Sequence, residues 1–146
     1  MQPTFRHFLL TPLLFVFGVP ALFIENVGAA DPMLIVNLAG KFKQCEGAPP
    51  GCERVLLKGD PQSEPFHSVL RFPKGWVFPK HWHVSAENLV MVRGLVTINS
   101  EGGREQTIKP GDYLYIPATL VHWGSCPEDC VFYLAVDGPD SFNVVE

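Results

Sequence analysis

The chain has 146 residues, of which 47% are hydrophobic and 18% charged, a balance typical of a globular domain rather than a disordered segment. Its formal net charge is −4, and its Lys and Arg residues are scattered singly along the sequence. Nucleic-acid binding requires clustered positive charge, so this composition argues against a nucleic-acid partner.

The first 30 residues have the features of a cleavable secretory signal peptide. Arg6 and His7 precede an apolar run at residues 8–24, and the small residues Ala29 and Ala30 follow it. A retained membrane anchor is the alternative, but prolines and a glycine interrupt the run, which is slightly shorter than a usual membrane span. We therefore expect a signal peptide at 1–30, a mature domain at 31–146, export to the periplasm or the medium, and no membrane attachment after cleavage.

Four cysteines form two close pairs in the sequence, and an even number of cysteines in an exported chain indicates disulfide bonds. The local pairing, Cys45 with Cys52 and Cys126 with Cys130, is favoured because each pair flanks a turn-forming segment. A zinc site with four thiolates is the alternative, but only the second pair has the usual knuckle spacing.

The mature sequence predicts an all-β fold, because short runs rich in Val, Ile, Leu, Phe and Tyr alternate with Gly, Pro, Asp and Asn. No window of helical length has a sustained apolar stripe. The predicted strands are residues 33–38, 54–58, 66–72, 77–84, 88–93, 95–99, 106–108, 112–116, 120–124 and 131–136. Closing such strands into a barrel or a two-sheet jelly roll removes exposed edges and creates a concave interior.

Two turns position the later strands. Lys109-Pro110-Gly111-Asp112 has Pro and Gly at the central positions of a type II turn. Gly94 stands between two apolar runs and predicts a tight reversal between two adjacent strands.

His81, His83 and Glu87 form the cluster with the most chemical information. Alternate side chains of a strand share a face, so the two histidines point the same way, and Glu87 can rejoin them after a bend. Exposed or core histidines with a surface glutamate are the alternative. That alternative leaves two imidazoles and a carboxylate poorly satisfied next to the apolar Trp76, Val77 and Phe78.

The spacing of these residues resembles the first motif of the cupin superfamily. Gly75, five residues, His81-Trp82-His83, three residues, Glu87, six residues and Gly94 reproduce that motif. Gly111, five residues, Pro117 and then His122 resemble the second motif. The sequence departs from the family pattern at Thr119, where a glycine is frequent, and at Cys126, where an asparagine is frequent.

The resemblance, which extends from about residue 57 to residue 145, implies a single-domain cupin β-barrel, a double-stranded jelly roll. It also implies that His81, His83, Glu87 and His122 bind one ion and leave two positions for water, substrate or dioxygen. Three imidazoles and a carboxylate suit one divalent transition metal: Fe, Mn, Ni, Cu, Co or Zn. A homodimer is a further expectation from the resemblance.

Other candidate pocket residues lie near these ligands in the sequence, and strand alternation turns about half of them away from the interior. They are Lys80, Trp82, Asn88, Met91, Tyr113, Tyr115 and Trp123. Tyr113 and Tyr115 share a face, so they are catalytic candidates if that face is interior, and outer packing residues if it is not. His67 is expected to be structural or exposed rather than a fifth ligand.

The function expected from this pattern is that of an exported metal-dependent cupin enzyme, of dioxygenase or lyase type, acting on a small organic substrate. A non-enzymatic module that binds or senses a metal or small ligand is the alternative, because one fold hosts many functions.

Overall fold

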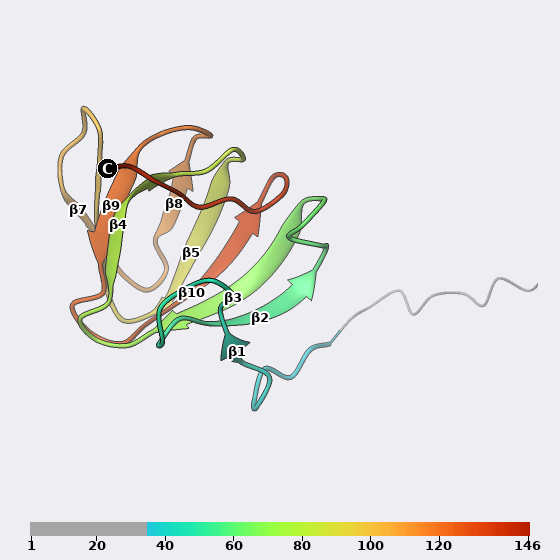
Figure 1. The fold of residues 1–146 in the computed structure, drawn as a ribbon. Helices are drawn as coiled ribbons and strands as arrows, with labels where there is room; N and C mark the ends of the chain where they lie inside the picture. The colour runs from blue at the N-terminus through green and yellow to red at the C-terminus, as the bar shows by residue number, and fades with distance from the viewer. Residues whose placement is uncertain (1–34) are drawn as a thin grey trace, which may run out of the picture. The chain divides into compact units, whose positions relative to one another are not determined.

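Eleven strands form two sheets in the computed structural model, which describes residues 35–146 (Figure 1). One sheet has six strands in the order β1-β2-β3-β10-β5-β8, and the other has five in the order β11-β4-β9-β6-β7. Their bounds are β1 Lys43–Gln44, β2 Glu53–Lys58, β3 Phe66–Phe72, β4 Val77–Trp82, β5 Glu87–Arg93, β6 Val96–Ser100, β7 Gln106–Ile108, β8 Tyr113–Ile116, β9 His122–Ser125, β10 Cys130–Val136 and β11 Asn143–Val144. All strand pairs are antiparallel.

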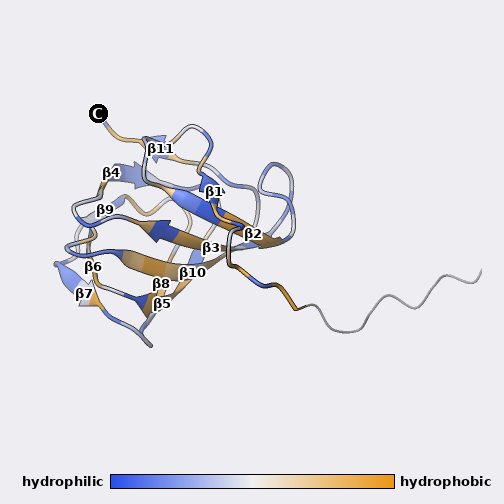
Figure 2. Cartoon of the chain, turned by 90° about the horizontal axis from the view of Figure 1, so that it is seen from below, coloured by the Kyte–Doolittle hydropathy of each residue, from blue (hydrophilic) through white to orange (hydrophobic). Residues whose placement is uncertain are grey.

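The core lies between the sheets, because alternate residues of each strand turn inward. In β10, Phe132, Leu134 and Val136 are buried and the residues between them are partly exposed. Aromatic rings pack at one end of this core, where Phe72 contacts Phe132, Phe78 and Trp76. Figure 2 shows hydrophobic residues concentrated on β10 and the strands beside it. The prediction of an all-β double-sheet jelly roll is confirmed.

Nine of the ten predicted strands match observed strands within two residues at each end, and two predictions from the sequence are wrong. No strand lies in the described part of the predicted run 33–38, and the first observed strand, β1, begins at Lys43. Gly94 does not join a paired hairpin, because β5 and β6 belong to different sheets. Gly94 instead has φ 76° where the chain crosses between sheets, and a Cβ there would lie 2.0 Å from the Asp129 carbonyl oxygen.

The disulfide and turn predictions are confirmed. Cys45 is bonded to Cys52, and Cys126 to Cys130. The amide of Asp112 donates to the carbonyl of Lys109 over 2.9 Å, and Gly111 has φ 92°, as a type II turn requires.

The predicted signal peptide at 1–30 lies outside the described residues. Within residues 35–146, which form one compact unit, no helix is long and apolar enough to cross a bilayer.

Candidate metal centre

Four polar side chains meet between the two sheets at one end of the jelly roll. His81 lies on β4 and His122 begins β9, and these two residues are directly paired across the sheet. His83 follows the end of β4, and Glu87 begins β5 in the opposite sheet. All four are at most 8% exposed, although most buried positions around them are apolar.

The three histidines lie close enough to act together. Potential ligand atoms of His81, His83 and His122 lie within 4.8 Å of one another. The ring centroid of His81 lies 4.2 Å from that of His122 and 4.8 Å from that of His83. The structure therefore brings together residues from two segments that are about 40 positions apart in the sequence.

Each imidazole is oriented by a backbone carbonyl. The Nδ1 atom of His81 donates to the carbonyl of Pro79 over 2.6 Å, and that of His122 donates to the carbonyl of Leu120 over 2.9 Å. His83 Nδ1 donates to the carbonyl of Ser141. A carbonyl can only accept, so each Nδ1 carries the hydrogen and each neutral ring keeps its lone pair on Nε2.

The carboxylate of Glu87 lies next to two of these lone pairs. Its Oε2 atom is 3.3 Å from Nε2 of His83 and 3.7 Å from Nε2 of His122. A carboxylate and two lone pairs repel one another in a buried site unless a positive charge lies between them. A proton on Glu87 or a cation bound by the whole group supplies that charge.

Burial dominates the pKa values of the group. It lowers the pKa of His81 to about 4, despite the hydrogen bond to Pro79. It also lowers the pKa of His83 and of His122, so all three rings are neutral near pH 7. Burial, and then the nearby charge of Asp140, raises the pKa of Glu87 to about 8. Neutral imidazoles are the form that binds metals, and an ion held also by Glu87 would take the place of the carboxyl proton.

The donor set fits a divalent transition metal. Three Nε2 lone pairs and one carboxylate suit Fe, Mn, Ni, Cu, Co or Zn, and each imidazole has the hydrogen-bonded Nδ1 that is usual for ligating histidines. A possible three-histidine metal site is thus present, and ligation by Glu87 as the fourth group remains a prediction.

Tyr113 and Tyr115 lie on the outer face of the six-stranded sheet. Their side chains are 60% and 52% exposed, and the Tyr113 hydroxyl donates to Asn88 Oδ1 over 2.6 Å. Glu87 pairs with Ile116, whose side chain is buried, so the tyrosines between the inward residues of β8 turn away from the histidines. The structure therefore places both tyrosines on the face that the outer packing alternative expects.

Most other candidate pocket residues also point outward. Lys80 lies over the ring of Trp123, with Nζ 4.8 Å from the ring centroid. Trp82 follows the inward His81 on β4, and Asn88 follows the inward Glu87 on β5. Met91 is interior and 2% exposed. His67 bonds to Tyr133 on the outer face, as expected for a structural histidine.

The sequence did not identify the contribution of the C-terminal segment. Ser141 provides the carbonyl for His83, and the ring of Phe142 stacks on His81 with centroids 4.1 Å apart and planes at 21°. Neither residue is of a type that usually binds transition metals, and Ser141 and Phe142 lie 58 and 61 positions from His83 and His81 respectively. Only the folded backbone reveals their role.

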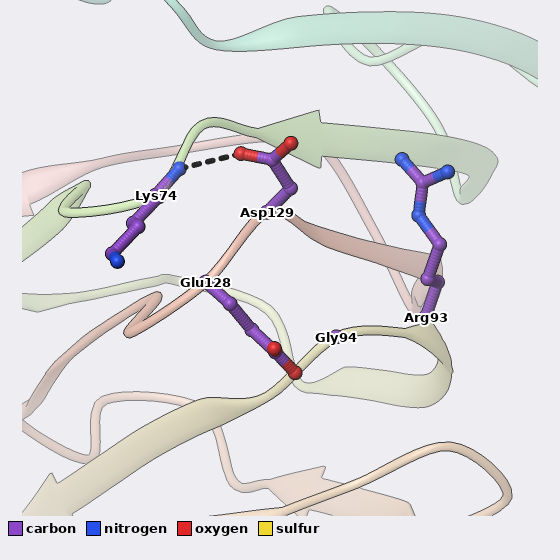
Figure 3. A pocket seen from close by; sticks show the side chains of 5 residues that line it. All are labelled: Lys74, Arg93, Gly94, Glu128 and Asp129. Atoms are coloured by element: carbon purple, nitrogen blue, oxygen red, sulfur yellow. Dashed lines mark hydrogen bonds between the residues drawn. The ribbon is translucent and has the colours of Figure 1, made fainter.

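A surface hollow of about 430 Å³ lies at the other end of β5 (Figure 3). Lys74, Arg93, Gly94, Glu128 and Asp129 line it, and the amide of Lys74 donates to the Asp129 carboxylate over 2.8 Å. Gly94 is seven positions from Glu87 along the strand direction, or about 20 Å away. The hollow has balanced charges and is separate from the histidine group.

Comparison with known proteins agrees with this architecture. Residues 68–136 match the family model described as "Cupin domain". The chain is also similar to the DNA damage-repair/toleration protein DRT102 of Arabidopsis thaliana, with 31% identity over 90 residues. The match covers 61% of this chain and 28% of that protein, so the chain spans less than a third of the length of this curated relative.

Several solved structures share the fold. The polyketide cyclase RemF from Streptomyces resistomycificus has a TM-score of 0.66 at 16% identity, covering 78% of this chain and 86% of its own. An acetylacetone dioxygenase from Acinetobacter johnsonii has a TM-score of 0.62 at 19% identity, covering 77% and 78%. The DMSP lyase DddQ from Ruegeria pomeroyi DSS-3 has a TM-score of 0.54 at 19% identity, covering 60% and 47%. At these identities the likeness shows the fold alone.

Proposed function

We propose that this protein, a double-sheet jelly roll with a cupin domain at residues 68–136, is a metal-dependent enzyme that acts on a small organic substrate. The proposed centre is one divalent transition metal held by His81, His83, Glu87 and His122. One observation carries the proposal: three buried imidazoles donate from Nδ1 to backbone carbonyls and so keep their Nε2 lone pairs for one shared ligand.

The proposed reaction is of dioxygenase or lyase type. A bound divalent ion would polarise an oxygen atom of the substrate and lower the pKa of its hydroxyl group. The chain itself would orient the three imidazoles, supply a carboxylate from the opposite sheet and exclude water through the apolar layer of Leu89 and Leu134. Solved proteins with this fold include a dioxygenase and a lyase, which supports both reaction types as candidates.

The proposal also includes export. All four cysteines are paired in the structure, and such disulfides persist in the periplasm or outside the cell rather than in a reducing cytoplasm. Cleavage after Ala30 can be tested by N-terminal sequencing of the protein recovered from a periplasmic extract or the medium. A first residue other than Asp31 would contradict this boundary.

The metal proposal is tested with two matched histidine variants. His122→Ala removes an interior ligand, whereas His67→Ala removes an outer histidine whose ring packs on Tyr133. Elemental analysis should find about one ion per chain in the wild type and in His67→Ala, and far less in His122→Ala. Equal metal content in the two variants would contradict the proposal.

Turnover is tested separately. The metal-loaded protein is screened against enols, catechols and small organic acids with an oxygen electrode and with detection of cleavage products. Oxygen uptake that His83→Ala abolishes would support a dioxygenase, and product formation without oxygen uptake would support a lyase. Tight binding of a ligand with no turnover would contradict the enzyme and favour a binding module.

A further inference from the structure

The C-terminal segment, residues 137–145, is tied to the strands and loops that surround the histidines (Figure 1, dark red). The amide of Asp137 donates to the carbonyl of Ala86 over 3.1 Å, and the amide of Val145 donates to the carbonyl of Lys80 over 2.9 Å. Between them, Asp140 forms an ion pair of 2.9 Å with Arg54. β11 then adds to the edge of the sheet beside β4.

His83 depends on this segment in a way that the other two histidines do not. His81 and His122 each donate to a carbonyl two positions earlier in the same stretch of chain. His83 donates to Ser141, which is 58 positions later. The Ser141 hydroxyl also accepts a hydrogen bond of 2.7 Å from the amide of Val84, and this bond holds Ser141 beside His83.

Phe142 covers the histidines from the same segment. Its ring stacks on His81 and lies edge-on to His83, with the latter centroids 5.8 Å apart and the planes at 71°. The side chain is 53% exposed, so one face of the ring covers the imidazoles and the other meets solvent. Core packing therefore does not account for its position.

We propose that the C-terminal segment is a positioning element of the metal centre, in which Ser141 orients the imidazole of His83 and Phe142 holds that of His81. The inference rests on the proposed function, because the group to be positioned is the proposed ligand set. Partners of this kind that orient ligating histidines commonly change metal affinity about 10- to 100-fold. Docking of the segment and binding of the ion should therefore stabilise one another.

The tautomer of each histidine tests the positioning without any metal. In the wild type, ¹⁵N NMR of the metal-free protein should show all three rings with the hydrogen on Nδ1. Deletion of residues 139–146 should leave His81 and His122 in this form, because their carbonyl partners remain. His83 should change to a mixture of tautomers. A pure Nδ1–H tautomer of His83 in the deletion variant would overturn the assignment of Ser141.

Metal affinity provides the second readout, measured with Zn²⁺ in competition with a chromophoric chelator. The deletion should weaken binding about 10- to 100-fold. If the deleted chain does not fold, the full-length Phe142→Ala variant decides the question. It should bind Zn²⁺ several-fold more weakly than wild type, and Phe142→Tyr should restore most of the loss.

Val92→Ala is the matched control, since Val92 lies on β5 outside the segment and is similarly exposed, at 55%. Equal affinities of Phe142→Ala and Val92→Ala would overturn the role of Phe142. Failure of the proposed function is distinguishable from failure of this inference. A wild type that binds no ion contradicts the metal centre, whereas a wild type that binds normally and a deletion that binds equally well contradict only the positioning element.

Discussion

The buried carboxyl group of Glu87 should make the stability of the metal-free protein depend on pH. Burial and the charge of Asp140 raise its pKa from 4.5 to about 8 in the folded protein. A group whose folded pKa is raised stabilises the fold below its unfolded pKa, and this stabilisation is lost as pH rises through the folded pKa. At a pH above the unfolded pKa, the native state must either keep the proton on Glu87 or bury an ionised carboxylate.

The magnitude is largest where only Glu87 titrates. Below pH 6.5 the histidines act in the opposite direction, because their pKa values are lowered and their stabilisation is lost as pH falls. Above pH 6.5 the histidines still offset part of this loss, because their unfolded-state imidazoles, with a pKa near 6.5, are only half deprotonated at that pH. Each pH unit below the folded pKa of Glu87 costs about 1.4 kcal/mol. Relative to Glu87→Gln, the free energy of unfolding of the wild type should therefore fall by about 2 kcal/mol between pH 6.5 and 8.5.

Urea denaturation of chelator-treated protein at several pH values measures this change, with Glu87→Gln as the matched variant. Glutamine has nearly the same shape and cannot ionise, so the variant should lose most of the slope. Saturating Zn²⁺ should reverse the slope in the wild type, because the ion binds the ionised carboxylate. Unfolding free energies of wild type and variant that fall in parallel from pH 6.5 to 8.5 would refute the reasoning.

Four further substitutions test other parts of the structure. Thr119 is β-branched and has φ 64°, so Thr119→Gly should raise the free energy of unfolding in urea by about 1 kcal/mol; a destabilised variant would contradict this. Gly94→Ala should lower it by more than about 2 kcal/mol, because its Cβ would meet the Asp129 carbonyl; near-wild-type stability would show that the crossing can relax. Tyr113→Phe and Tyr115→Phe should leave metal content and turnover unchanged, since both rings lie outside; loss of either would place them at the site.

Strand positions could be predicted from the sequence because hydrophobic alternation and turn residues are local signals. The run at 66–72 matches β3, and Lys109-Pro110-Gly111-Asp112 forms the predicted turn. Which strands pair with one another is not determined by local sequence. Apolar runs on both sides of Gly94 fit a hairpin as well as a crossing, and only the packing of two sheets selects the crossing.

The meeting of the histidines could be predicted in part. The spacing of His81 and His83 places both on one face, and the resemblance to cupins added His122. His81 lies directly opposite His122 because of the register in which β4 and β9 pair. That register shifts between Phe78 and His81, and the sequence does not predict the shift. The roles of Ser141 and Phe142 could not be predicted, because a backbone carbonyl is present at every position.

The proposed ligand set also connects the two sheets. His81 and His122 belong to one sheet, whereas Glu87 begins a strand of the other. A bound ion would therefore join the sheets at the end where buried polar groups replace apolar contacts. Without the ion this end has only a proton between Glu87 and two lone pairs, and it should be the least stable part of the core.

Hydrogen exchange should accordingly be faster at the start of β5 and β9 in the metal-free protein than at Phe132 in β10, and the ion should reduce this difference. Equal exchange at the two ends without metal would show that the apolar core alone holds the sheets together.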